Sequence, residues 1–205
     1  VRGERDLDFA PTHEHLTILF ANVHEFSNNT GGLLARQMSE VLNEYLVRMT
    51  DVVFEHGGTV DKFIGDSVKA VFGAPESIPG GEQVSRATAC AGAMQEAMGE
   101  LNRTWEARGL PMLQLRTGVH HGPCVVGNFG GERRTEYTAI GPAVNLASRI
   151  EEVCPPGSVL ISREVANLMP GGKAEPAGDF ELRGIEHPVP LYRCTEAASV
   201  AGKAV

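Results

Sequence analysis

The sequence predicts an α+β fold, and two long helical patterns and a hairpin are the observations that predict it. Residues 33–56 and 82–108 carry apolar side chains at the spacing of amphipathic helices. Apolar runs of strand length precede, separate and follow these two segments. Gly65-Asp66 joins two of the runs as a hairpin turn, so neighbouring strands are expected to pair antiparallel. Two long helices against a mainly antiparallel sheet give the ferredoxin-like βαββαβ arrangement.

The first half of the predicted domain contains this core in order. Residues 16–23, LTILFANV, are apolar enough to form a buried central strand. The helix at 33–56 follows and ends at Gly57, since glycine commonly terminates helices. The hairpin at 59–73 comes next, and a loop rich in proline and glycine leads from it into the helix at 82–108.

The second half is predicted to contain shorter elements. Pro142 and Ser162 each suit the start of a helix, as a first-turn proline and an N-cap. His121-Gly122 predicts a turn between two strands rather than a metal site. The predicted strands are 113–120, 123–128, 136–140, 159–161, 180–182 and 189–194, and the predicted helices are 142–153 and 162–168.

Composition is that of an ordinary soluble globular protein. The 205 residues are 42% hydrophobic and 21% charged, which is enough to build a sizeable core. The formal net charge of −8 argues against a nucleic-acid binder, whose surface would be basic. A nucleotide needs only a local phosphate site and stays compatible with this charge.

The expected location is the cytoplasm. No apolar run of 18 residues and no charged-then-apolar leader occurs, so this segment is expected to make no membrane contact. The four cysteines lack CxxC spacing, which favours reduced thiols over a zinc site or a disulfide framework.

The predicted domain covers residues 16–195. Residues 1–15 are polar and are interpreted as a linker or entry arm, and residues 196–205 as a C-terminal tail. The chain starts at Val1 rather than at a methionine, so a longer parent protein is expected. A membrane anchor elsewhere in that parent is compatible with the sequence.

The hairpin turn is the first candidate site. It holds the Asp66 carboxylate on a rigid base, and hard cations such as Mg²⁺ prefer oxygen ligands held in fixed positions. Lys62 lies four residues earlier on the ingoing strand. An ordinary hairpin with a solvated aspartate and lysine is an equal alternative at this point.

Two further places carry polar residues with binding potential. The segment from Asn22 to Ser27 follows the first strand, and its backbone N–H groups are suited to phosphate oxygens. Asn145 and Arg149 are four apart and share one face of a predicted helix, where Arg149 offers a planar fork of donors to phosphate. An ordinary loop and a solvated helix face remain the alternatives. Arg183, near a turn, is uninformative by itself.

Four segments together resemble a known family. They are LTILFANVHEFS, VDKFIGDSVKAVFG, GVHHGPCVVGNFG and YTAIGPAVNLASRIE, in this order. This combination resembles the class III nucleotide cyclase catalytic domain, the adenylate/guanylate cyclase homology domain of bacterial type. The resemblance covers residues 16–194, nearly the whole chain.

The resemblance implies a mechanism and partners. Two domains pair head to tail, as a homodimer here, and build sites at their interface. Two Mg²⁺ or Mn²⁺ ions bind there, the 3′-hydroxyl of the substrate attacks the α-phosphate, and pyrophosphate leaves a 3′,5′-cyclic nucleotide. The implied substrate is ATP, because lysine at the base-recognising position accompanies adenine.

The resemblance also assigns roles to residues. Asp66 corresponds to a metal ligand, and Lys62 and Thr138 correspond to the two base-recognising positions. Asn145 and Arg149 correspond to the pair that orients the ribose and stabilises the transition state, acting from the opposite protomer.

The phosphate groups have their own implied contacts. Phe26 and Ser27 lie in the implied phosphate-binding turn, and Arg183 falls near a basic residue that contacts the terminal phosphates. The Val23 carbonyl is an additional implied metal ligand. Ile185 stands where a second basic residue is common, which weakens the implied triphosphate contacts.

Asn22 departs from the family pattern, which has aspartate as the second metal ligand. Asparagine keeps one carbonyl oxygen and loses the charge and the bridging oxygen, which is expected to cost at least ~10-fold in metal affinity or activity. A naturally degenerate domain, a weak cyclase helped by Mn²⁺ and a substitution introduced to trap substrate are the open explanations.

Two functions follow from the resemblance. One is an adenylate cyclase that makes cyclic AMP and pyrophosphate at a homodimer interface, impaired by Asn22. The other is a degenerate cyclase homology domain that acts as a nucleotide-binding or regulatory module. A cyclic-dinucleotide synthase is disfavoured, because the chain has no GG[DE]EF-type signature.

Overall fold

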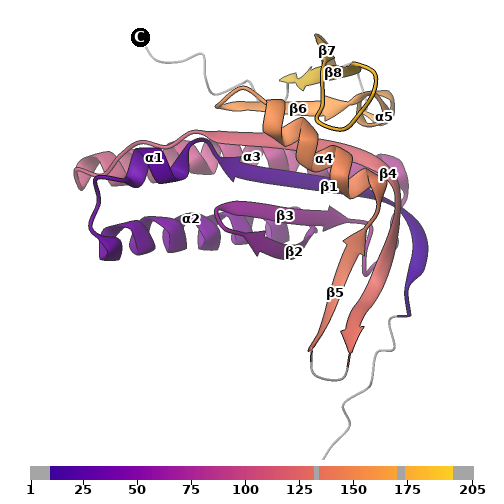
Figure 1. Cartoon of the computed structure of the whole chain (residues 1–205), viewed down its shortest axis with the longest axis horizontal. Helices are drawn as coiled ribbons and strands as arrows, with labels where there is room; N and C mark the ends of the chain where they lie inside the picture. Colours follow the sequence, from indigo (N-terminus) through magenta and orange to yellow (C-terminus); the bar gives the residue numbers. More distant parts are fainter. Residues whose placement is uncertain (1–9, 132–133, 170–173, 196–205) are drawn as a thin grey trace, which may run out of the picture.

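The computed structural model describes residues 10–131, 134–169 and 174–195, and these residues confirm the predicted α+β fold (Figure 1). The βαββαβ core consists of β1 (Thr12–Val23), α2 (Ala35–Glu55), β2 (Thr59–Ile64), β3 (Ser67–Phe72), α3 (Gly80–Ala107) and β4 (Leu115–Gly131). Its strands lie in the order β2-β3-β1-β4, and every neighbouring pair is antiparallel.

The remaining described elements are added to this core. They are α1 (Phe26–Thr30), β5 (Arg134–Ile140), α4 (Pro142–Val153), β6 (Ser158–Ser162), α5 (Arg163–Leu168), β7 (Ala174–Phe180) and β8 (Val189–Cys194). β6 pairs parallel with β4, and β8 and β7 follow antiparallel, so the sheet is mixed and mostly antiparallel. β5 pairs with the end of β4, and this hairpin projects away from the body of the domain (Figure 1).

β1 is buried on both faces, as its apolar run predicts. Leu19, Ala21 and Val23 pack in the cluster beneath α2 and α3, and the alternate residues Leu16 and Ile18 pack in the cluster beneath α4. Successive side chains of a strand point to opposite faces, so one run of eight residues supplies both layers. Each fully buried large aliphatic side chain contributes roughly 1.5–3 kcal/mol.

Three element predictions need correction. β1 begins at Thr12 rather than residue 16, since Thr12 already pairs with Val126. The predicted turn at His121-Gly122 is wrong, because β4 runs through it in unbroken register with β1. A Cβ at Gly122 would lie 2.8 Å from His120 Nε2 and 3.2 Å from the Cβ of Ala143, so this glycine gives room to His120 and to α4 and does not turn the chain.

The strand predicted at 180–182 is also wrong. β7 ends at Phe180, and Leu182 is buried in the loop beyond it. Pro176 and Gly178 in β7 weaken the strand signal, and the pairing with β8 is shifted between them, as is typical of edge strands. Among the predicted end segments, most of the entry arm and the whole tail lie outside the described residues.

The described helices include none with the length and apolar character needed to cross a membrane.

Candidate functional site

The hairpin turn brings Asp66 next to the end of β1. Gly65 adopts φ +63°, a conformation that glycine reaches without strain, and this sets up the turn. Asn22 lies opposite Ser67 in the strand register, so it reaches the turn from the neighbouring strand. Its Nδ2 donates a hydrogen bond of 3.0 Å to Asp66 Oδ2.

Arg116 reaches Asn22 from β4, the strand on the other side of β1. Arg116 lies opposite Asn22 in the register with β4, and its Nη2 donates to Asn22 Oδ1 at 3.1 Å. The same Nη2 is 3.1 Å from Glu151 Oε1 on α4. We call Asn22, Asp66, Arg116 and Glu151 the Asn22 cluster.

The pKa of Glu151 in this cluster is raised, and burial is the largest cause. Burial raises the pKa of Glu151 to about 7, with smaller contributions from the charges of Glu152 and Asp66, whereas Arg116 opposes the rise. Near neutral pH Glu151 is therefore only partly ionised, and it adds less than a full negative charge beside Asp66.

The donor set of the cluster fits one hard divalent cation better than two. Asp66 supplies a carboxylate, and the Val23 carbonyl follows Asn22 in the chain. The Asn22 oxygen already accepts from Arg116, and its nitrogen faces Asp66. Within the described ranges, no group of three or more His, Cys, Asp and Glu side chains is placed to hold a metal ion.

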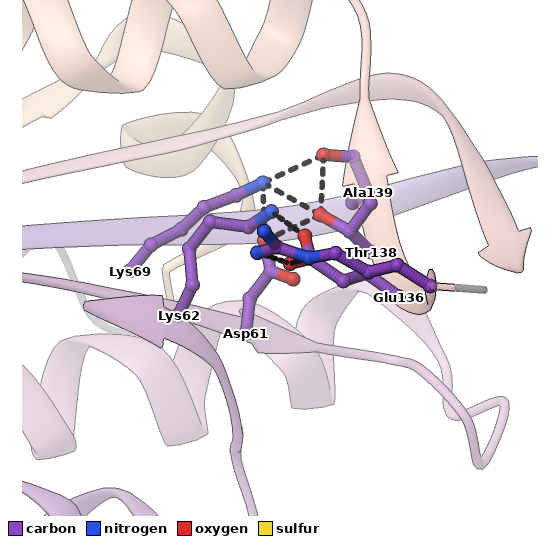
Figure 2. A network of polar contacts seen from close by, with 7 residues as sticks. Asp61, Lys62, Lys69, Glu136, Thr138 and Ala139 are labelled. Atoms are coloured by element: carbon purple, nitrogen blue, oxygen red, sulfur yellow. Dashed lines mark hydrogen bonds and ion pairs between the residues drawn. The ribbon is translucent and has the colours of Figure 1, made fainter. Parts of the chain in front are cut away.

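A second polar group joins the hairpin to β5 (Figure 2). Lys62 Nζ donates to Glu136 Oε2 at 2.9 Å, and Thr138 Oγ1 donates to Asp61 Oδ2 at 2.8 Å. Lys69 forms an ion pair with Asp61 and donates to the Ala139 carbonyl at 2.6 Å. We call Asp61, Lys62, Lys69, Glu136 and Thr138 the Asp61 network.

A shift in strand pairing explains why adjacent residues both reach β5. Val60 pairs with Ala70 and Lys62 pairs with Lys69, so Asp61 is an extra residue without a partner of its own on β3. In a regular strand Asp61 and Lys62 would point to opposite faces. A bulge re-aims side chains in this way and is common beside active sites.

The helix face that carries Asn145 and Arg149 points away from the Asn22 cluster. Glu151 faces β4 and Arg116, and Arg149 lies two residues earlier, about 200° around the helix. Arg149 Nη1 is buried without a hydrogen-bond partner among the described residues, close to Gly184. Asn145 is exposed. One chain thus does not bring this pair to Asp66.

The remaining predicted residues lie at the ends of elements. Val23 is the buried last residue of β1, and Phe26 and Ser27 form the first turn of α1, a short helix that the sequence did not predict. Arg183 is exposed, and its Nη2 lies 3.3 Å from Glu152 Oε1. The roles assigned to these residues stay predictions.

Sequence reasoning missed Arg116, Glu151, Asp61 and Lys69. Lys69 had a readable signal, because a lysine in the middle of an apolar strand needs a buried partner. The other three depend on strand register and on the packing of α4, which no local pattern encodes.

Comparison with known proteins places this chain in a family. Residues 9–195 match the family described as the adenylate and guanylate cyclase catalytic domain. Adenylate cyclase 1 of Rhizobium meliloti is 31% identical over 204 residues, covering 94% of this chain and 30% of the relative. The adenylate cyclase of Anabaena cylindrica is 30% identical over 197 residues, covering 93% of this chain and 37% of the relative. The chain thus spans about a third of the length of these curated relatives.

Solved structures agree with this comparison. The adenylyl cyclase CyaB from P. aeruginosa superposes with a TM-score of 0.85 at 34% identity, covering 90% of this chain and 95% of that chain. The guanylyl cyclase Cya2 superposes with a TM-score of 0.82 at 35% identity, covering 89% and 92%. On the family match, the sequence identity and the shared fold, this chain belongs to the class III adenylate and guanylate cyclase catalytic domains.

Proposed function

We propose that this domain is an adenylate cyclase, which converts ATP to 3′,5′-cyclic AMP and pyrophosphate at the interface of two copies. The proximity of Lys62 and Thr138 carries this proposal. They come from β2 and β5, two strands that meet where Lys62 contacts Glu136 and where Asp61 contacts Thr138.

Adenine suits this pair better than guanine. Lysine only donates hydrogen bonds, so Lys62 matches a ring nitrogen acceptor of adenine. Guanine presents an N–H group there, which would leave donor facing donor, and an unpaired polar group in a binding site is strongly disfavoured. Overall identity does not discriminate, since CyaB and Cya2 are 34% and 35% identical to this chain.

On α4, Glu151 and the Asn145–Arg149 pair lie on different faces, and this supports a site built by two copies. Asp66 and Lys62 lie on the hairpin side, and the Asn145–Arg149 face of the same chain points elsewhere. A head-to-tail pair would bring this face of one copy to the hairpin of the other. Arg149 would then neutralise charge developing on the α-phosphate, and Asn145 would orient the ribose.

Contacts to the phosphates complete the proposed site. Phe26 and Ser27 would offer backbone N–H groups, and Arg183 would pair with the terminal phosphates. Asp66, with the Val23 carbonyl, would hold one Mg²⁺ or Mn²⁺. Such an ion favours the alkoxide form of an attacking hydroxyl and neutralises phosphoryl charge.

The Asn22 cluster motivates the second candidate function, a nucleotide-binding or regulatory module. Asn22 makes hydrogen bonds to both Asp66 and Arg116, so its amide is already engaged by protein groups where a second metal ligand would be needed. In that case the domain would bind ATP without turning it over.

Product formation from ATP and GTP, with Mg²⁺ and Mn²⁺ separately, tests the proposal. Asn22→Asp is expected to raise the rate at least ~10-fold, because it restores a charged metal ligand. Asn167→Asp, on the exposed face of α5, adds the same charge elsewhere and is the matched control.

The outcomes separate the two functions. Cyclic AMP from the unchanged protein supports a working cyclase. Product from Asn22→Asp alone supports the binding or regulatory module. No product from either form, in a protein that is dimeric in solution, contradicts the proposed enzyme.

A further inference from the structure

We propose that Asp61 and Lys69 hold the Thr138 hydroxyl as a hydrogen-bond acceptor and thereby set the preference for adenine over guanine. The inference rests on the proposed function, in which Thr138 contacts the base. It assigns a positioning role to a buried ion pair that contacts no substrate itself.

Distances decide which way the hydroxyl points. Thr138 Oγ1 is 2.8 Å from Asp61 Oδ2, and its alternative acceptor, the Ala139 carbonyl, is 3.5 Å away. A carboxylate only accepts hydrogen bonds, so the hydroxyl proton lies toward Asp61. Lys69 Nζ approaches the same oxygen at 3.5 Å and only donates.

Thr138 is therefore left as an acceptor. A hydroxyl has one proton and two lone pairs, and the proton is already directed to Asp61. Adenine carries an exocyclic amino group, a donor, where guanine carries a carbonyl oxygen. An acceptor at Thr138 suits the amino group and opposes the carbonyl.

Burial keeps this arrangement in place. The side chains of Lys69 and Asp61 are only 5% and 2% exposed, and they pair with each other. Removing either partner alone would leave an uncompensated buried charge, so the ion pair holds the Asp61 carboxylate in place. Asp61 Oδ1 is buried without a hydrogen-bond partner among the described residues.

The bulge in β2 makes the contact geometrically available. Because Asp61 is the extra residue, it reaches Thr138 while its neighbour Lys62 reaches Glu136 on the same strand (Figure 2). Glu136 and Thr138 are two residues apart and share one side of β5. The residue that fixes the hydroxyl and the lysine proposed to read the ring are therefore adjacent in the chain.

The test measures nucleotide preference as a ratio. The double variant Asp61→Asn/Lys69→Met removes both charges together, since loss of a whole buried pair is tolerated far better than loss of one partner. The amide that this variant introduces at position 61 can donate to Thr138, which frees the hydroxyl to donate to guanine. The ratio of affinities for α,β-methylene-ATP and α,β-methylene-GTP is expected to fall about tenfold. The kcat/KM ratio for ATP and GTP is expected to follow.

Combining the double variant with Thr138→Val distinguishes an effect on the Thr138 hydroxyl from general damage to the protein. Valine has no hydroxyl, so in that background the Asp61→Asn/Lys69→Met change is expected to leave the ratio where Thr138→Val set it. Thr138→Ser keeps the hydroxyl and is expected to keep the preference. Thermal unfolding checks that each protein is folded.

The outcomes separate the inference from the proposed function. An adenine preference in the unchanged protein that falls in the double variant, and does not fall further in the Thr138→Val background, supports the inference. An adenine preference that survives the double variant, or that falls equally in both backgrounds, overturns the inference alone. A protein that binds neither analogue, or prefers the guanine analogue, contradicts the proposed function and the inference with it.

Discussion

Lys62 pairs with Glu136, and a bound base would have to replace this partner. Its ammonium group lies 2.9 Å from Glu136, and the side chains of the two residues are 35% and 41% exposed. The Lys62 hydrogen bond, together with Arg134, lowers the pKa of Glu136, so the carboxylate is charged and competes for the lysine. Exposed pairs of this kind exchange partners at little cost.

Removal of this competitor is expected to strengthen ATP binding. Glu136→Gln should lower the KM for ATP by about two- to fivefold, because an exposed ion pair is weak, with a smaller effect at high salt. Initial rates at several ATP concentrations measure it. Glu76→Gln removes an exposed charge from the loop after β3 and is the matched control. A higher KM in Glu136→Gln would mean that Glu136 positions Lys62 rather than competing for it.

At the scale of elements, the clarity of local signals decided which parts of the fold were predictable. α4 runs from Pro142 to Val153 as predicted, because Gly-Pro starts it and Cys-Pro-Pro-Gly ends it. The hairpin was predictable from its Gly65-Asp66 turn and from the apolar residues on either side of it. β4 was not, because Gly122 looks like a turn residue, and only its close contacts with His120 and with α4 show why a glycine is there.

The candidate-site residues that lie in sequence motifs were predictable. The residues that strand register brings together were not. The sequence picked out Asp66, Lys62, Asn145 and Arg149. Arg116 reaches Asn22 only because β1 and β4 pair in one particular register. Asp61 reaches Thr138 only because β2 bulges, and one-residue shifts in pairing leave no trace in local composition.

The contact between β4 and α4 provides a prediction for these elements. A Cβ at Gly118 would lie 2.4 Å from the backbone nitrogen of Glu151 and 2.8 Å from the Ala147 carbonyl oxygen. Gly118→Ala is therefore expected to displace α4, lower the free energy of unfolding by about 1–3 kcal/mol and reduce activity through Asn145 and Arg149.

Gly99→Ala is the matched control in α3. The nearest atom to its Cβ would be Arg103 Nη1 at 3.9 Å, so there is room. Alanine in a helix interior is expected to stabilise by about 0.5–1 kcal/mol with activity unchanged. Thermal or urea unfolding and initial rates measure both variants. Equal stability of Gly118→Ala and the unchanged protein would contradict the close packing of α4 on β4.

At the scale of the whole molecule, the residues proposed to form the site lie in two groups that face different ways on one chain. The hairpin side offers Lys62, Thr138 and Asp66, and the outer face of α4 offers Asn145 and Arg149. The central claim is that two copies join these two groups into complete sites. A symmetric pair would then have two equivalent sites, each with residues from both copies.

Complementation between two damaged copies tests this claim most directly. Asp66→Ala and Arg149→Ala are each made in the more active background, the unchanged protein or Asn22→Asp, and each alone is expected to be inactive. On mixing, half of the dimers combine both variants, and one of the two sites in each is intact, so activity should recover to about a quarter. A mixture that stays inactive, although both variants are dimeric and exchange subunits, would contradict a site shared between two copies.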